Sequence, residues 1–355
     1  MGMKFRMFLI FLSLHVLFVQ LMDAQNSIDK KNSDQTTPLF EEQDLLTLKL
    51  KFSIKNVKYN TNDSTYLNSI LYYKNASLAW DSLDVKLRAR GQHRRENCYF
   101  TPLKLKLKKS SAKGTVFKGN EKLKVVLPCS ANSTSNDYIV KEYLAYKLYE
   151  IISPYHFKTR LVDIELIQEK GQRSKTHFLK GILIEDIDKV EKRFNAREYK
   201  RLIHPFAQDD RYSINLAFFQ YLIANTDFST HFQHNVKLLF IDTKYISIPY
   251  DFDMSGLVNT NYSAVSGIDN LSRKIQYVTQ RLYKGYKRDP LLFEETRQYF
   301  LSHKNEILNT IDGLNEFFIN QNQIPKTKKF LMEFYDILEN DKKFTDNIIS
   351  QTRTK

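Results

Sequence analysis

Three short segments of the chain carry side chains that can bind a metal ion or move a proton. They are Asn225-Thr226-Asp227, His234-Asn235 and Tyr250-Asp251-Phe252-Asp253. Mg²⁺ prefers carboxylate and amide oxygens as ligands, and such an ion neutralises the charge that develops during phosphoryl transfer. Clustered carboxylates also repel one another, so we expect a raised pKa for at least one of them when no cation is bound. These segments are candidates for a phosphoryl-transfer site, although Asp and Asn are also ordinary turn residues.

The sequence around these segments predicts a helix and then a β-hairpin. Apolar residues recur at helical spacing from Asp210 to Leu222, and this pattern stops shortly before Asp227. Residues 236–241 and 245–252 form two apolar runs separated by a short polar turn, which is typical of paired strands. The polar segments would therefore lie at the end of a helix and at the ends of a hairpin.

The expected strand geometry also predicts on which face of the strand each acidic side chain lies. Side chains alternate between the faces of a strand, so Asp251 and Asp253 would share one face while Phe252 anchors the other. Protein kinases use a similar order of parts: a catalytic Asp, an Asn that helps to hold metal, a hairpin and a metal-binding Asp. This chain departs from that pattern, because Asp227 and Asn235 are farther apart and Asp253 stands where glycine is usual.

Further segments in a fixed order accompany these three. They are Leu87-Arg88-Ala89-Arg90-Gly91, Pro102-Leu103-Lys104-Leu105-Lys106-Leu107, Lys122-Leu123-Lys124-Val125-Val126-Leu127-Pro128-Cys129, Glu142-Tyr143-Leu144-Ala145-Tyr146-Lys147-Leu148 and Leu183-Ile184-Glu185-Asp186. Through these segments, over residues 83–286, the chain resembles the CotH-like group of atypical kinases, and more narrowly an exported bacterial branch of that group.

The resemblance implies a role for each polar residue. Asp227 matches the catalytic base and Asp251 matches the metal-holding Asp. Asn235 and Asp253 are implied to hold the metal or to orient a neighbouring ligand. The implied cofactors are Mg²⁺ or Mn²⁺ together with ATP or another nucleotide donor.

The hydrophobic patterns and the resemblance together predict the fold class. Strand-like alternation dominates up to about Ile184, and helical spacing follows. We expect an α+β protein with an atypical protein-kinase-like two-lobe fold. A strand-rich N-terminal lobe would cover residues 41–190 and a helical C-terminal lobe residues 191–355. A cleft between the lobes would then receive the polar segments.

Cations that could bind phosphate lie in the N-terminal half. Leucine and lysine alternate over residues 103–108, so a strand there would turn its leucines inward and Lys106 outward. Lys124 precedes Glu142 by a spacing that suits the lysine–glutamate pair of kinases. Arg90, Lys106, Lys124 and Glu142 are therefore candidates for nucleotide binding. A solvated strand face is the more ordinary explanation for each single lysine, and the sequence contains no glycine-rich phosphate loop.

The N-terminal sequence predicts that the protein is exported. Lys4 and Arg6 precede an apolar run over residues 8–21, as in a secretory signal peptide. We expect a signal peptide at residues 1–24, a polar flexible lead-in at residues 25–40 and the CotH kinase-like domain at residues 41–355. The mature protein would be periplasmic or secreted and would have no transmembrane span. A retained membrane anchor is the alternative.

The predicted export affects whether the two cysteines, Cys98 and Cys129, form a disulfide. In an oxidising compartment they can form a disulfide that closes a loop of about thirty residues, worth roughly 3 to 4 kcal/mol of stability. Two buried free thiols are the alternative, because the sequence does not show whether the sulfur atoms are within reach.

The net charge of +14 favours anionic partners, which include nucleotides and acidic proteins or envelope components. Dispersed lysines that only increase solubility explain the same charge. No nucleic-acid-binding motif is visible, so we expect no nucleic acid partner.

These observations predict an exported, metal- and ATP-dependent phosphotransferase that acts on a protein or envelope component. Two alternatives remain open. The first is a kinase-like basic binding protein without catalytic activity. The second is a metal-dependent phosphoesterase that uses His231, His234, Asp227 and Asp251.

Overall fold

A computed structural model describes residues 36–268 and 274–354 of the chain. The predicted signal peptide, residues 1–24, and residues 25–35 of the predicted lead-in lie outside the described residues. Helix α2 (Pro38–Glu41) already packs onto the protein, because Leu39 and Phe40 are buried. The packed chain therefore begins before the predicted domain boundary at residue 41.

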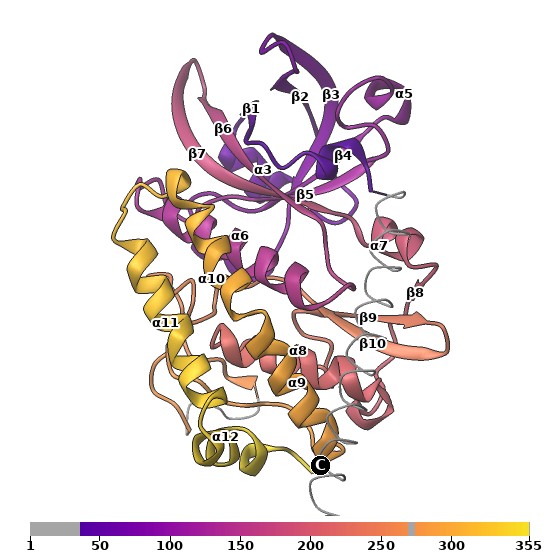
Figure 1. The fold of residues 1–355 in the computed structure, drawn as a ribbon. Helices are drawn as coiled ribbons and strands as arrows, with labels where there is room; N and C mark the ends of the chain where they lie inside the picture. Colours follow the sequence, from indigo (N-terminus) through magenta and orange to yellow (C-terminus); the bar gives the residue numbers. More distant parts are fainter. Residues whose placement is uncertain (1–35, 269–273, 355) are drawn as a thin grey trace, which may run out of the picture. The chain divides into compact units, whose positions relative to one another are not determined.

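The strands of the N-terminal half close into a seven-stranded barrel (Figure 1). The order around the barrel is β1, β2, β3, β4, β5, β7 and β6, and β6 returns to β1. That closing contact is parallel, whereas the other pairs are antiparallel. The strands are β1 (Leu46–Phe52), β2 (Leu67–Lys74), β3 (Trp80–Ala89), β4 (Leu103–Leu107), β5 (Lys122–Val126), β6 (Thr159–Lys170) and β7 (Arg173–Glu185).

This barrel overturns the predicted fold. We expected an α+β, kinase-like two-lobe fold, with strands in residues 41–190 and helices in residues 191–355, and the structure instead has a closed barrel with helices elsewhere. Alternation of leucine and lysine shows that one face of a strand is buried, and it suits an open sheet and a closed barrel equally. The pairing of β1 with β6 decides between the two, because it leaves the barrel without a free edge.

Alternate side chains of the strands fill the barrel interior. Leu103, Leu105 and Leu107 of β4 are buried, while Lys106 is exposed on the outer face, as predicted. Strands β6 and β7 form a hairpin around Gly171. Gly171 has a φ of 62°, a left-handed conformation that glycine adopts at little cost.

Helices and a smaller sheet accompany the barrel. The sheet has the order β10, β9, β8, formed by β10 (Lys244–Pro249), β9 (Val236–Ile241) and β8 (Arg197–Glu198). Helix α6 (Ser135–Ile152) contacts β6 and β7, and helix α8 (Asp210–Leu222) contacts β10. Further helices are α3 (Ile54–Asn60), α4 (Gln92–Asn97), α5 (Lys109–Ala112), α7 (Ile187–Arg193), α9 (Pro290–Ser302), α10 (Lys304–Asp312), α11 (Gln323–Leu338) and α12 (Asp341–Asn347).

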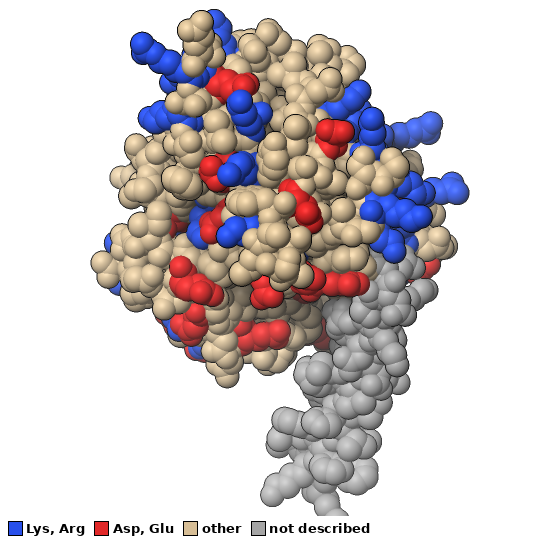
Figure 2. Space-filling model, turned by 90° about the horizontal axis from the view of Figure 1, so that it is seen from above, with Lys and Arg blue, Asp and Glu red and all other residues tan. Residues whose placement is uncertain are grey.

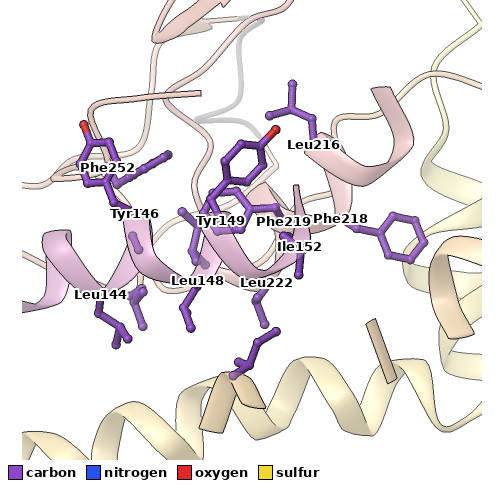
Figure 3. Close-up of a cluster of buried hydrophobic side chains, with 14 of the residues drawn as sticks. Leu144, Tyr146, Leu148, Tyr149, Ile152, Leu216, Phe218, Phe219, Leu222 and Phe252 are labelled. Carbon is purple, nitrogen blue, oxygen red and sulfur yellow. The ribbon is translucent and has the colours of Figure 1, made fainter. Parts of the chain in front are cut away.

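A second hydrophobic core lies between α6 and α8. Figure 3 shows buried side chains of both helices in this core, among them Leu148 and Tyr149 of α6 and Phe219 and Leu222 of α8. The Tyr149 and Phe219 rings have centroids 4.8 Å apart. Phe252, which follows β10, joins the same core. The predicted helix over residues 210–222 is thus confirmed, and this packing fixes the segments at its end.

A disulfide joins Cys98 to Cys129, as predicted from the cysteine pair. It connects the end of α4 to the segment after β5, and the backbone N–H of Tyr99 donates to the carbonyl of Cys129 at 2.8 Å. The bond therefore fixes the segment that carries α4 against the barrel.

Reduction of this disulfide should lower the free energy of unfolding by roughly 3 to 4 kcal/mol, because the unfolded chain regains loop entropy. The measurement is guanidinium denaturation with and without dithiothreitol. A Cys98→Ser/Cys129→Ser variant should show the lower stability and should not respond to the reductant. An unchanged midpoint for the reduced wild-type protein would contradict this expectation.

The described surface is rich in basic side chains. On the face drawn in Figure 2, lysine and arginine gather in several places, and acidic side chains are more frequent towards the lower part of the view, with others among the basic ones. Within the part of the chain that the structure describes, none of the helices combines the length and apolar character needed to cross a bilayer.

Candidate active site

Asp227 lies in the turn that follows α8. Ala224 takes a left-handed backbone conformation there, with a φ of 48°, and the side chain of Asn225 accepts a hydrogen bond from the Asp227 N–H at 3.0 Å. The Asp227 carboxylate then accepts hydrogen bonds from Asn235 Nδ2 at 2.9 Å and from Ser266 Oγ at 3.1 Å. The structure thus brings the predicted base and the predicted metal-holding asparagine into direct contact.

His234 also contacts Asp227, with Nε2 lying 3.3 Å from Oδ1. Burial acts to raise the pKa of Asp227, but the hydrogen bond and positive charge of His234, together with Ser266, outweigh it and lower that pKa. The hydrogen bond to Asp227 in turn raises the pKa of His234 above its ordinary value. Asp227 is therefore an ionised, oriented carboxylate at neutral pH.

We expect Asp227→Asn to bring the pKa of the His234 imidazole back towards about 6.5, because the raised value depends mainly on the hydrogen bond to Asp227. A histidine pKa that is raised by folding adds stability at low pH, and this contribution disappears as the pH rises through the folded-state pKa. Imidazole chemical shifts followed by NMR against pH measure the change. Asp242→Asn, which removes an exposed carboxylate from the hairpin turn, should leave the His234 titration unchanged. A His234 titration that is the same in wild type and Asp227→Asn would refute the coupling.

Asp251 and Asp253 follow the end of β10. The strand stops at Pro249, and Asp251 has a left-handed φ of 66°, so the predicted strand alternation through Asp251 and Asp253 is wrong. Phe252 is fully buried, and its ring lies 4.7 Å from the Tyr146 ring and 5.4 Å from the Phe219 ring. The predicted anchoring role of Phe252 is confirmed. Its buried ring fixes the backbone between the neighbouring residues Asp251 and Asp253.

Two of the predicted ligand residues have a strained backbone. Asn235 has a φ of 51° and Asp251 a φ of 66°. Asn and Asp tolerate this region better than other residues with a side chain, yet each still costs on the order of 1 kcal/mol. Hydrogen bonds hold both in place: Tyr250 N–H donates to the Asn235 carbonyl at 3.0 Å, and Asp251 N–H donates to Tyr146 Oη at 2.9 Å. Backbone strain of this kind is frequent at functional sites.

Asp253 is buried beside two other polar side chains. Tyr262 Oη donates to its Oδ2 at 2.9 Å, and Arg94 Nε lies 3.8 Å from the same oxygen. Burial, and then the negative charge of Asp251, raise the pKa of Asp253 to about 6, with a further contribution from Asp227 and an opposing one from Arg94. This agrees with the expectation that repulsion within the acidic cluster raises at least one pKa.

Glu142 faces the cluster from α6. It is buried, its Oε2 lies 3.8 Å from Arg94 Nη1, and its Oε1 has no hydrogen-bond partner in the described part of the chain. Burial raises its pKa well above the ordinary value, and Asp253 and Asp251 add to the shift against the opposing charge of Arg94. Arg94 is thus shared at 3.8 Å between Glu142 and Asp253.

Three residues of the cluster carry oxygen atoms of the kind that Mg²⁺ or Mn²⁺ binds. Among the described residues, no three His, Cys, Asp or Glu side chains converge as a ready metal site. Mg²⁺ is usually held by only one or two carboxylates, with water and substrate phosphates completing its shell. Asp251, Asp253 and the amide oxygen of Asn235 could supply those protein ligands, because Asn235 uses its Nδ2 on Asp227.

The predicted lysine–glutamate pair is not formed. Glu142 pairs with Arg94, whereas Lys124 Nζ lies over the rings of Phe157 at 4.8 Å and Tyr250 at 5.2 Å. Burial, and then the charge of Arg90, lower the pKa of Lys124 to about 7. Lys124 therefore reaches the edge of the site through Tyr250, the residue before Asp251.

Of the other two predicted cations, Arg90 lies near the acidic cluster and Lys106 does not. The charge of Arg90 acts on Glu142, Tyr146 and Tyr250, so Arg90 belongs to the surroundings of the acidic cluster. Lys106 Nζ instead lies 4.1 Å over the Tyr66 ring on the outer face of the barrel. In the described structure no contact joins Lys106 to the acidic residues, so the geometry gives it no place in the site.

Sequence reasoning missed Arg94, Tyr262 and Ser266. Arg94 lies in the short helix α4 (Gln92–Asn97), which the sequence analysis did not predict, and Arg90 lies before that helix, so helical spacing does not link the two. Tyr262 and Ser266 lie in an irregular segment after Asp253, where no periodic pattern points to them. The resemblance to CotH-like kinases stays a prediction. No family model matches the chain, and no curated protein matches it.

Proposed function

We propose that this protein is an exported, metal-dependent phosphotransferase. It would move a phosphoryl group from a phosphoanhydride donor such as ATP, with Mg²⁺ or Mn²⁺, to a hydroxyl group of a protein or envelope component. The observation that carries the proposal is the contact of Asn235 with Asp227, beside Asp251 and Asp253, whose negative charges act on each other and on His234 or Glu142. Carboxylate and amide oxygens suit a divalent cation and the phosphates that it carries.

Each residue has a distinct task in this proposal. Asp227, kept ionised by His234 and oriented by Asn235, would accept the proton of the acceptor hydroxyl as the new oxygen–phosphorus bond forms. The donor's phosphoanhydride bond breaks, and its electron pair leaves with the departing phosphate. Asp251 and Asp253, with Asn235, would hold the divalent ion, which neutralises charge on the transferred group.

A binding and transfer screen tests the proposal. The purified full chain is mixed with nucleotides and Mg²⁺ or Mn²⁺, in parallel with Asp251→Ala and Asp227→Ala. Metal-dependent nucleotide binding should be lost in Asp251→Ala only, and transfer should be lost in both variants. Binding without transfer for any acceptor would favour an inactive binding protein, and binding that is unaffected by Asp251→Ala would refute the assigned site.

A metal-dependent phosphoesterase is a second candidate, because the His234 ring contacts Asp227. In that case His231 and His234 would both be metal ligands. His231 instead packs 4.6 Å from the Phe232 ring and 6.5 Å from the His204 ring. His231→Ala should abolish a phosphoesterase and should have little effect on a phosphotransferase that uses oxygen ligands.

A further inference from the structure

A groove of about 690 Å³ lies beside the candidate active site, at the end of β3 and next to α3 and α4. Arg88 comes from the end of β3, Arg90 directly follows that strand, Lys58 comes from α3 and Arg95 comes from α4. Arg90 lines this groove and also acts electrostatically on Glu142. The groove adjoins the acidic cluster through α4, because Arg95 lines the groove and the preceding Arg94 lies 3.8 Å from Glu142 and from Asp253.

The groove carries an excess of positive charge. Its acidic side chains are Asp63 and Glu96, against four cations. Asp63 pairs with Arg88 at 2.8 Å, and Glu96 accepts a hydrogen bond from Gln92 at 3.3 Å. Two positive charges thus remain unmatched within the groove lining, which favours an anionic ligand.

Guanidinium nitrogens remain available in the groove. Arg88 uses Nε on Tyr66 and Nη1 on the Ala89 carbonyl, and Arg95 uses Nε on the Lys58 carbonyl and Nη2 on the Thr61 carbonyl. Each keeps one terminal nitrogen without a hydrogen bond among the described residues.

Arg90 keeps its whole guanidinium, because the hydrogen bonds recorded for it within the described chain involve only its backbone. Arginine presents its donors in a planar fork that matches two oxygens of one phosphate group. Several such forks along one groove suit a ligand that carries several phosphate groups.

The groove offers little to a nucleobase. Its aromatic side chain is Tyr59, which is 70% exposed, and its other lining residues are charged, polar or small. Nucleobase and drug-like ligands bind in pockets with mostly apolar walls, which shield their rings from water. A ligand that is polar along its whole length fits this lining better.

We propose that this groove binds a linear condensed phosphate chain and that such a chain is the phosphoryl donor. This inference rests on the proposed function and names its donor class. The acceptor oxygen bonds to the terminal phosphorus, its proton passes to Asp227, and the terminal phosphoanhydride bond breaks. The electron pair stays on the bridging oxygen, so the donor leaves one phosphate shorter.

Isothermal titration calorimetry of the full chain with inorganic tripolyphosphate tests the groove. Wild type should bind saturably, and Arg90→Gln should weaken binding by about tenfold or more, as expected for loss of a hydrogen-bonded charge. Lys86→Gln is the matched control, because it removes an exposed positive charge from β3 outside the groove. Equal weakening in both variants, or no saturable binding in wild type, would overturn the inference.

A second set of measurements separates this inference from the proposed function. Titrations are repeated in Asp227→Asn, which should bind tripolyphosphate as wild type does while transferring phosphate about 10²- to 10⁴-fold more slowly. Transfer from ATP without any tripolyphosphate binding would overturn the inference and leave the proposed function standing. Tight, Arg90-dependent binding without transfer from any donor would support the groove and count against the proposed function.

Discussion

Replacing Asp227 by asparagine is expected to lower the rate of phosphoryl transfer by about 10²- to 10⁴-fold, the usual contribution of a general base. The amide cannot take the acceptor's proton, while its size and most of its hydrogen bonds remain. Asn235 and Ser266 can still contact the new side chain, so the local structure should persist. Single-turnover transfer at saturating donor measures the loss.

The matched control for Asp227→Asn is Asp242→Asn, which neutralises an exposed acidic residue in the same hairpin region. It should transfer phosphate at the wild-type rate. Donor binding should be similar in all three proteins. An Asp227→Asn variant that keeps more than about a tenth of the wild-type rate would remove Asp227 from the role of base.

Arg94→Met should destabilise the protein by about 3 to 5 kcal/mol near pH 8, as is typical when one partner of a buried charge cluster is removed. Arg94 lies between Glu142 and Asp253 and also donates to the Leu127 carbonyl. Removing it leaves the buried Glu142 and Asp253 without the cation that lies 3.8 Å from each of them. The loss should be smaller at pH 5, because the pKa of Asp253 is about 6 and its carboxyl is then largely protonated. Urea denaturation at both pH values measures the difference.

The double variant Arg94→Met/Glu142→Gln separates charge from packing. If the destabilisation comes from uncompensated charge, this variant should recover much of the lost stability at pH 8. An equal loss at pH 5 and pH 8, with no recovery in the double variant, would instead attribute the effect to packing and to the lost Leu127 hydrogen bond.

Local periodicity predicted the separate elements well. The helix at residues 210–222, the hairpin at residues 236–249 and the alternation of β4 all appear in the structure. These elements depend on neighbours in sequence, which a single chain displays directly. Barrel closure does not depend on neighbours in sequence, because the contact of β1 with β6 joins strands that are far apart in the chain. The two-lobe fold was wrong for that reason.

The site was predicted in part for the same physical reason. Asp227, Asn235 and Asp251 lie at the ends of periodic elements, so the pattern located them. The partner of Glu142 could not be found this way, because spacing suggested Lys124 and the structure supplies Arg94 from a short helix. Short helices with few apolar residues, such as α4, leave little trace in a hydrophobic pattern.

The most direct test of this account is Mn²⁺ binding to the purified chain, followed by electron paramagnetic resonance of the free ion. We predict one saturable site at pH 7.5, at least tenfold weaker binding in Asp251→Asn, and weaker binding at pH 5, where Asp253 becomes protonated. Asp242→Asn should bind as wild type does. Binding that is unchanged by Asp251→Asn and by the lower pH would contradict the central claim that these carboxylates form a divalent-cation site.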